Sequence, residues 1–566
     1  MIATSATWAF TTAGPATQAA QAAQARIKAT ADPDTATSIK HVIVVLGENR
    51  TFDHVFGTFQ PDAGQTVFNL LSQGIMNADG SPGPNFARGK QWEASATTAY
   101  SIHPSKTTPY AQLPAINDGT KPDPRFPPLP NGPFDVLAYA STSDSFAEPV
   151  NRFFQNWQQI DCDASAATPA NPSGCQKDLF PWVEVTAGAG EGAASMGVYS
   201  SRKGLSPYFD QLARQYAMSD NFHQAVLGGS AANHLELFYG APLFFANADG
   251  TPGVPPAGFI ENPNPRSGTN NGYTSDGYHS GSYTMCADVS QPGAAPIRDY
   301  LSALPSRPFH GCYPGEYYLV NNFAPGFFGN GSRAPLSSTD YTIPPTSQPH
   351  IGTLLNKHGV SWKYYAGGWA EGSEGVGFCD HCNGFLYSAQ TMTSASERTA
   401  HLKDLAELYT DIQNGALPAV AFVKPSELYD GHPSDSTWQL FEGFSQTIIE
   451  MVQANPTTWA DTAIIVTVDE GGGYWDSGYI QPVDFFGDGP RIPFIVVSKA
   501  SQNIGIVHTY YDHVSIDKFI ERNWQLGETI SLRSRDNLPN PSADPSNPYA
   551  PHNSPAIGDL FELFGK

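Results

Sequence analysis

The chain has 566 residues, of which 30 are lysine or arginine and 53 are aspartate or glutamate, for a net charge of −23. Nucleic acid is therefore not expected as a partner, because phosphate backbones bind basic surfaces. The sequence has no continuous apolar stretch of about 18 residues, so we also expect no stable insertion into a membrane.

Residues 1–38 are rich in alanine, threonine and glutamine, and we interpret them as a leader or a disordered N-terminal segment. The segment lacks the basic and apolar regions of a complete signal peptide, although "QAAQA" resembles the surroundings of a signal cleavage site. We expect residues 39–566 to form a single domain.

Short apolar runs predict buried strands at 41–46, 361–366, 419–424, 462–468 and 493–498. Helical patterns lie between them at 204–217, 232–240, 351–359, 395–415 and 436–454. Such alternation predicts an α/β fold with a mainly parallel central sheet flanked by helices. Residues around 60–200 and 241–345 lack this pattern and are rich in glycine, proline, asparagine and serine, which indicates long loop-rich insertions.

Six cysteines form three sequence-local pairs, 162/175, 286/312 and 379/382. An even number in local pairs favours disulfides and an oxidising compartment, so we expect a secreted or periplasmic protein. The alternative is six reduced thiols. A structural zinc site at 379–382 is disfavoured because no second cysteine pair with ligand spacing follows.

Polar side chains follow three of the predicted strands. Glu48 and Asn49 follow the first run, Asp469 and Glu470 follow the run at 462–468, and His432 lies shortly after 419–424. Ligands of open α/β sheets bind beyond the carboxyl ends of the strands, and such oxygens with histidine suit a divalent cation. We predict one ion, whose identity stays open among Ca²⁺, Mg²⁺, Mn²⁺, Zn²⁺ and iron. The alternative is that these are solvated loop residues or helix caps.

Ser230 follows two glycines and begins a helical pattern. A hydroxyl there lies in the positive field of the helix, where backbone N–H groups hold anions. Beside a metal, Ser230 becomes a candidate nucleophile, and Asn233, one turn later, a candidate donor to a phosphoryl oxygen. The alternatives are an N-cap serine and a surface amide.

Several ordered motifs resemble those of one family. "GENRTFDHVFGTF" (47–59) is similar to the signature of the bacterial phosphoesterase family, which contains phospholipases C and secreted acid phosphatases. "SDNFHQAVLGGSAANH" (219–234), "YDGHPSD" (429–435) and "VTVDEGGGYWD" (466–476) extend the resemblance. The closest likeness is to the secreted acid phosphatases.

The resemblance implies an alkaline-phosphatase-like core and a role for each matching residue. Glu48, Asn49, Asp469 and Glu470 match metal ligands, and Ser230 matches a nucleophile that also faces the metal. His432 matches a histidine that contacts the phosphate or protonates the leaving group. His381 matches a second pocket histidine, with Cys382 where relatives often carry histidine, and His103 is a third candidate. We also expect Arg50 and Asp53 to brace the first motif by pairing.

We therefore expect a secreted, metal-dependent acid phosphatase that hydrolyses small phosphate monoesters through a phosphoserine. The alternative is a phospholipase C that cleaves phosphodiester lipids such as phosphatidylcholine, and a third possibility is a binding protein on an inactive scaffold. Phospholipases C of this family are typically longer and begin with a twin-arginine leader. This sequence shows neither feature, which favours the monoester.

Overall fold

The computed structural model describes residues 32–566, apart from 119–120, 145–147, 189–190, 277–280, 336–341, 371–372, 543 and 545. Most of the predicted leader, residues 1–31, lies outside the described residues. The Thr37 side chain is buried and its hydroxyl donates to Asn523 Oδ1 at 2.7 Å, so the chain joins the folded core before residue 38.

The centre of the fold is a sheet that has eight strands among the described residues. The strands follow the order β17 (Leu402–Asp404), β14 (Trp362–Ala366), β18 (Val420–Lys424), β1 (His41–Gly47), β19 (Thr462–Val468), β20 (Phe494–Ser498), β8 (Ala217–Ser219) and β21 (Gly505–Val507). β1 pairs in parallel with both neighbours, while β20 is antiparallel to β19 and β8. The predicted α/β class and mainly parallel sheet are confirmed.

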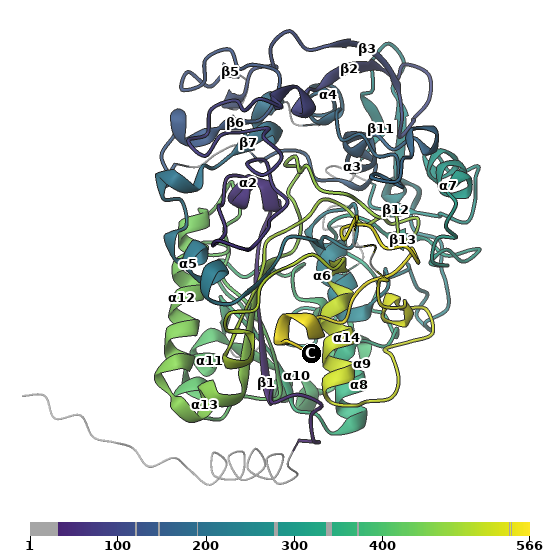
Figure 1. Cartoon of the computed structure of the whole chain (residues 1–566). Coiled ribbons are helices and arrows are strands. Elements are labelled where there is room, and N and C mark those ends of the chain that lie inside the picture. The colour runs from purple at the N-terminus through teal and green to yellow at the C-terminus, as the bar shows by residue number, and fades with distance from the viewer. Residues whose placement is uncertain are drawn as a thin grey trace, which may run out of the picture.

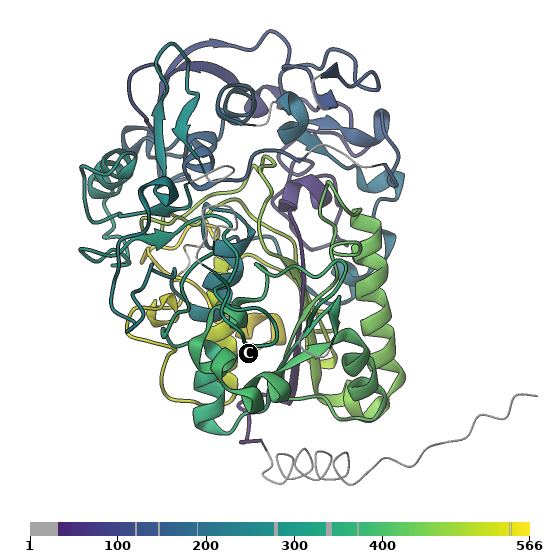
Figure 2. The same ribbon diagram turned by 180° about the vertical axis from the view of Figure 1, so that it is seen from behind.

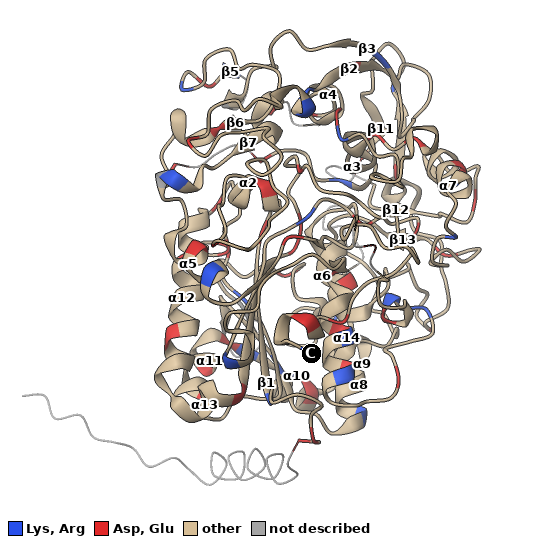
Figure 3. Cartoon of the chain, viewed as in Figure 1, with Lys and Arg blue, Asp and Glu red and all other residues tan. Residues whose placement is uncertain are grey.

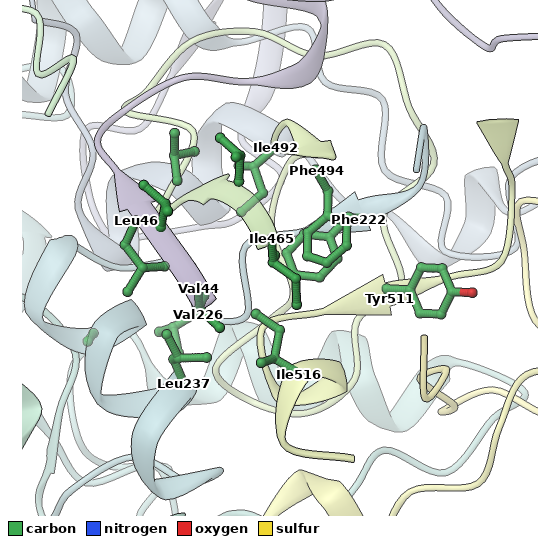
Figure 4. Packing of buried hydrophobic residues seen from close by; sticks show 14 of the residues in the cluster. Val44, Leu46, Phe222, Val226, Leu237, Ile465, Ile492, Phe494, Tyr511 and Ile516 are labelled. Atoms are coloured by element: carbon green, nitrogen blue, oxygen red, sulfur yellow. The ribbon is translucent and has the colours of Figure 1, made fainter. Parts of the chain in front are cut away.

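Helices cover both faces of the sheet (Figures 1 and 2). One layer contains α5 (Pro207–Gln215), α11 (Leu405–Gln413), α12 (Trp438–Ala454) and α13 (Pro456–Asp461). The other contains α6 (Ser230–Tyr239), α8 (Ile351–His358), α9 (Ala389–Thr393) and α14 (Val514–Asn523). Figure 4 shows the core under this second layer, where Leu237 of α6 and Ile516 of α14 lie beside Val44 and Ile465 of the sheet.

One predicted helix is wrong. The pattern at 395–415 predicts a continuous helix, but the chain forms α10 (Ala395–His401), then β17, then α11. Leu402 is buried where β17 pairs with β14, because the open edge of the sheet accepts a further parallel strand. β17, β8 and β21 have three residues each, which is too short for an apolar run to show in the sequence.

The two predicted insertions lie together beyond the carboxyl end of β1, at the top of Figure 1. The first insertion, between residues 60 and 200, contains α3 (Phe153–Ile160), α4 (Phe180–Ala187) and short strands such as β2 (Trp92–Ser95) and β3 (Ser105–Pro109). The second insertion, between residues 241 and 345, contains α7 (Ala294–Ala303), β10 (Asn262–Pro265) and β11 (Tyr273–Ser275). That residues 39–566 form one domain stays a prediction.

The cysteines form the three expected bridges, Cys162–Cys175, Cys286–Cys312 and Cys379–Cys382. Figure 3 shows acidic and basic residues dispersed over the helices and loops in this view. Within the described part of the chain, no helix is both long and apolar enough to cross a bilayer.

Candidate active site

A cavity of about 200 Å³ lies where the carboxyl ends of the central strands meet the insertions. Its walls are polar and draw on the strand-end loops, on both insertions and on one disulfide. The lining residues are Glu48, Glu148, Asn151, Arg152, Ser230, Asn322, Cys379, His381, Cys382, Glu427, Asp430, His432 and Asp435.

The turn after β1 has an unusual backbone. Asn49 has φ of 57°, in the left-handed region that asparagine tolerates better than most residues. Gly472 approaches this turn so closely that a Cβ on it would lie 2.5 Å from Asn49 Cβ. Only glycine therefore allows the two strand-end loops to meet here. The Asn49 amide is buried, and neither its oxygen nor its nitrogen has a hydrogen-bond partner among the residues that the structure describes.

Ser230 lies on the floor of the cavity, as the first residue of α6. The N-cap of the helix is Gly229 and Ser230 is the first helical residue, so the N-cap alternative is wrong. Its hydroxyl instead lies 3.2 Å from Glu48 Oε2 and 3.0 Å from Glu470 Oε1. A hydroxyl has one proton to donate, so Ser230 can donate to one of these two carboxyl groups at a time.

Three carboxyl groups converge beside Ser230. Asp469 Oδ1 accepts hydrogen bonds from the backbone N–H groups of Asn49, at 3.1 Å, and Glu470, at 2.7 Å. Burial, together with the charge of Glu48, raises the pKa of Asp469 and the pKa of Glu470 well above their ordinary values. One oxygen of each, Asp469 Oδ2 and Glu470 Oε2, is buried and has no hydrogen-bond partner in the described part of the chain.

Glu48 behaves differently from the other two carboxyl groups. Burial acts to raise its pKa, but Lys424 and His234 outweigh burial and hold the pKa well below its usual range. Lys424 Nζ lies 3.1 Å from Glu48 Oε1 and 2.7 Å from Asp430 Oδ2, and His234 Nε2 lies 3.2 Å from Glu48 Oε1. The sequence did not single out Lys424 or His234 as site residues, although Lys424 ends the predicted strand at 419–424 and His234 ends the motif "SDNFHQAVLGGSAANH".

His432 lies in the cavity wall, in the loop after β18. Its Nε2 lies 3.3 Å from Glu148 Oε1, and its Nδ1 lies 2.9 Å from the hydroxyl oxygen of Ser434, which donates to Asp435 Oδ2 at 2.8 Å. Burial acts against the charged form, yet the hydrogen bond and charge of Glu148 raise the pKa of His432 above its ordinary value. The imidazolium is thus favoured at mildly acidic pH.

Of the remaining predicted site residues, His381 lines the cavity and Asn233 does not. His381 lines the cavity beside the Cys379–Cys382 disulfide. Asn233 does not: its oxygen accepts from Val226 N at 2.9 Å, and its nitrogen donates to the Gly228 carbonyl at 3.1 Å. The Asn233 amide therefore holds the glycine turn, and its predicted contact with a phosphoryl oxygen is not supported.

Two further expectations need correction. His103 lies outside the cavity lining, where its Nδ1 bonds Asp161 Oδ1 at 2.6 Å. Arg50 does not pair with Asp53 but donates to the Asn49 carbonyl at 2.9 Å. Asp53 instead faces Arg491 Nη2 at 3.2 Å, because the buried Arg491 is shared between two aspartates.

The insertions supply four cavity residues that the sequence did not indicate: Glu148, already described, and Asn151, Arg152 and Asn322. Asn151 donates to Glu470 Oε1 at 2.6 Å, and Arg152 beside it brings a buried guanidinium. Asn322 Oδ1 accepts from Ala231 N at 2.9 Å, at the start of α6. These residues lie in regions without a periodic pattern, where position in the sequence gives no sign of a shared site.

The oxygen donors around Ser230 fit a divalent cation, and of this set Glu48 and Ser230 line the cavity itself. Glu48, Asp469, Glu470, Asn49 and Ser230 offer oxygen ligands, several of which are buried without hydrogen-bond partners. Unpaired buried oxygens are costly, and the crowded carboxylates repel one another, so a cation would relieve both. The predicted single ion is consistent with this arrangement, and its identity stays open.

Known proteins resemble the chain over segments of different length. It is 26% identical over 280 residues to the "Non-hemolytic phospholipase C" of Burkholderia pseudomallei, which covers 40% of this chain and 38% of that protein. It is 26% identical over 206 residues to a "Probable acid phosphatase" of Kluyveromyces lactis, covering 35% of this chain and 46% of that protein. With "Phospholipase C A" of Mycobacterium tuberculosis, the match is 22% over 581 residues, 94% of this chain and 83% of the relative.

Solved structures give a weaker likeness. A protein in the alkaline phosphatase superfamily from Vibrio parahaemolyticus aligns over 58% of this chain and 62% of its own, with 11% identity and a TM-score of 0.26. So low a score carries no argument, and the fold rests on the strand order itself. A family model described as the Phosphoesterase family matches residues 39–527, a range that includes Glu48, Asn49, Ser230, Asp469 and Glu470. The chain therefore belongs to the phosphoesterase family.

Proposed function

We propose that the protein is a metal-dependent hydrolase of small phosphate monoesters in which Ser230 is the nucleophile. The observation that carries the proposal is the Ser230 hydroxyl, held between Glu48 and Glu470 at the floor of a polar cavity. The family and the probable acid phosphatase among the relatives support hydrolysis of a phosphate ester. The three disulfides support a secreted or periplasmic location.

The residues divide the reaction into two displacements at phosphorus. Ser230 Oγ attacks, its proton passes to a neighbouring carboxylate, and the bond to the leaving oxygen breaks as His432 protonates that oxygen. His432 then accepts a proton from water, which attacks the phosphoserine. The bond between phosphorus and Ser230 Oγ breaks, the carboxylate returns its proton to Oγ, and inorganic phosphate leaves. A bound divalent cation would supply positive charge beside the hydroxyl and the phosphoryl oxygens, held by Glu48, Asn49, Asp469 and Glu470.

The cavity supports a small substrate. Its volume of about 200 Å³ lies below the range of about 300–1,000 Å³ that is usual for drug-sized ligands. Arg152 lines the wall and, with a protonated His432, offers positive charge to a phosphate dianion. A compact monoester would fill such a space, whereas most of a lipid would have to remain outside.

A second candidate is the phospholipase C activity that several relatives' names carry. Glu148, Glu427 and Asp435 line the same cavity and would suit a cationic head group attached to the phosphate. This candidate differs from the first in one measurable property, the preference for a phosphodiester over a monoester.

The deciding experiment compares two chromogenic substrates on the same enzyme. We expect kcat/KM for p-nitrophenyl phosphate at mildly acidic pH to exceed that for p-nitrophenyl phosphorylcholine by at least about tenfold, near 1.4 kcal/mol in transition-state binding. Equal values, or comparable release of diacylglycerol from phosphatidylcholine vesicles, would favour the phospholipase. If the folded, metal-loaded protein hydrolyses neither substrate, the result would favour a binding protein on an inactive scaffold.

A further inference from the structure

The Cys379–Cys382 disulfide forms part of the cavity wall. Cys382 Sγ lies 3.5 Å from Glu48 Oε1, and Cys379 Sγ lies 3.6 Å from His381 Nε2. A disulfide with only two residues between its cysteines therefore lies between a carboxylate, Glu48, and an imidazole, His381, which are both common types of metal ligand. The other two bridges do not line this cavity.

Two pairs of donor atoms at this disulfide, Cys382 with Glu48 and Cys379 with His381, are spaced like neighbouring ligands of a tetrahedral ion. Metal-to-ligand distances of about 2.0–2.3 Å place neighbouring ligand atoms of a zinc site about 3.3–3.8 Å apart. The measured separations of 3.5 and 3.6 Å fall in this range. The donor atoms of Cys379, His381 and Cys382 all lie within 4.8 Å of one another, as do those of Glu48, His234 and Cys382.

We propose that reduction of this disulfide creates a thiolate–imidazole metal site inside the cavity, with Cys379, Cys382, His381 and Glu48 as its ligands. A small dithiol donates two electrons and two protons, so that the S–S bond breaks and the dithiol becomes a disulfide. Each cysteine then loses its proton as its sulfur binds Zn²⁺, which prefers thiolate and imidazole ligands. While the bridge is intact, its sulfurs are not thiolates and the site does not exist.

The new site shares Glu48 with the floor of the cavity. A zinc ion bound by the thiolates would withdraw Glu48 from Ser230, from which its Oε2 is 3.2 Å distant. Reduction in the presence of zinc would therefore suppress hydrolysis. This consequence rests on the proposed function, whereas the metal site does not.

The test uses Co²⁺ as a spectroscopic substitute for Zn²⁺ on the full-length protein. Mild reduction with dithiothreitol, followed by removal of the reductant, should yield two alkylatable thiols that peptide mapping assigns to Cys379 and Cys382. Adding Co²⁺ to that protein should produce sulfur-to-cobalt charge-transfer absorption, which excess Zn²⁺ abolishes. The oxidised protein should give none.

Two variants separate this site from general effects of reduction. The double variant C379S/C382S should lack the absorption, while C286S/C312S, which removes a bridge outside the cavity, should keep it after the same treatment. If C379S/C382S fails to fold, reduced wild-type protein alkylated with iodoacetamide takes its place and should also lack the band. Reduced protein without thiolate absorption, or a band that persists in C379S/C382S or after alkylation, would overturn the proposal.

The absorption and the enzyme assay report on different claims. A thiolate band in a protein that hydrolyses no phosphate ester would leave the metal site standing and remove the proposed function. An enzyme that hydrolyses phosphate monoesters but shows no thiolate band after reduction would leave the proposed function standing and remove the metal site.

Discussion

At the scale of single residues, Ser230 and His432 both line the cavity but differ in their surroundings and in the proton transfer that these favour. The hydroxyl of Ser230 is buried against carboxylates, so its neighbours accept protons. The imidazole of His432 is paired with Glu148, which favours its protonated form. One side chain is thus placed to lose a proton and the other to give one.

Replacing Ser230 by alanine should lower kcat by about a factor of 10³ or more, because the nucleophile is lost while the cavity keeps its walls. Steady-state kinetics on p-nitrophenyl phosphate measures the loss, and the circular dichroism spectrum should match that of wild type. Acid quench of the wild-type enzyme should trap phosphate on Ser230. A Ser230→Ala enzyme with a tenth of normal activity would remove the assignment.

Replacing Glu148 by glutamine should lower the pKa of His432, because the carboxylate charge that raises it is gone. The histidine would then lose its proton at a lower pH, so the alkaline limb of the kcat/KM profile should move towards acid. Glu148→Asp, which keeps the charge, is the matched control. An unchanged alkaline limb in Glu148→Gln would show that His432 is not the acid.

At the scale of elements, the strand-end loops are tied together by Arg491, in the segment before β20. Its guanidinium is fully buried and contacts Asp476 at 2.8 Å and Asp53 at 3.2 Å, and it donates to the Asp220 carbonyl at 2.9 Å. Asp53 lies in the helix after the Glu48 turn, and Asp476 lies in the loop after Glu470. The two loops that form the floor of the cavity are therefore held by one cation.

Replacing Arg491 by methionine should reduce the free energy of unfolding by about 3–5 kcal/mol, because two buried aspartates lose their partner. Urea denaturation of the metal-free protein measures the change. Arg214→Met is the control: its pair with Asp62 at 2.9 Å is exposed, so we expect about 1 kcal/mol or less. Equal effects of the two substitutions would contradict the role given to Arg491.

Elements with a strong local pattern were predictable from the sequence. The five predicted strands lie within one residue of β1, β14, β18, β19 and β20, because each is a continuous apolar run. The strand-end rule likewise located Glu48 and Glu470. The direction of β20 and the edge strand β17 were not predictable, since pairing between distant segments leaves no periodic mark.

The cavity walls were less predictable than its floor. Asn151, Arg152 and Asn322 lie in loop-rich insertions, and only the folded chain brings them to Ser230. The role of Asn233 was misjudged because a helical position one turn after the nucleophile does not reveal which way the amide turns. Its bonds to the glycine turn settle that direction.

At the scale of the whole molecule, stability should depend on both pH and metal. The pKa values of Asp469 and Glu470 are raised in the folded state, so the folded protein binds more protons than the unfolded chain above about pH 4. Their contribution is present below that pH and is lost as pH rises, by up to about 1.4 kcal/mol per pH unit for each group. The metal-free protein should thus lose stability as the pH rises above about 4.

A divalent cation needs these carboxyl groups deprotonated, so the stabilisation that it adds should grow over the same pH window. Thermal unfolding with chelator and with added Mg²⁺, Mn²⁺ or Ca²⁺, at several pH values, measures both trends. Asp469→Asn should flatten the pH dependence of the metal-free protein and shrink the shift that metal produces. A metal shift that is the same at every pH, or unchanged in Asp469→Asn, would place the ion elsewhere.

The position of β1 has a consequence for how this protein is made. Its neighbours in the sheet begin at Val420 and Thr462, yet β1 itself begins at His41. At a translation rate of about 5–20 residues per second, β1 leaves the ribosome roughly 20–80 s before its second partner is synthesised. An apolar strand that waits so long without a neighbour is exposed to aggregation. The nascent chain therefore needs a chaperone, or its own insertions, to shield β1 until the sheet can close.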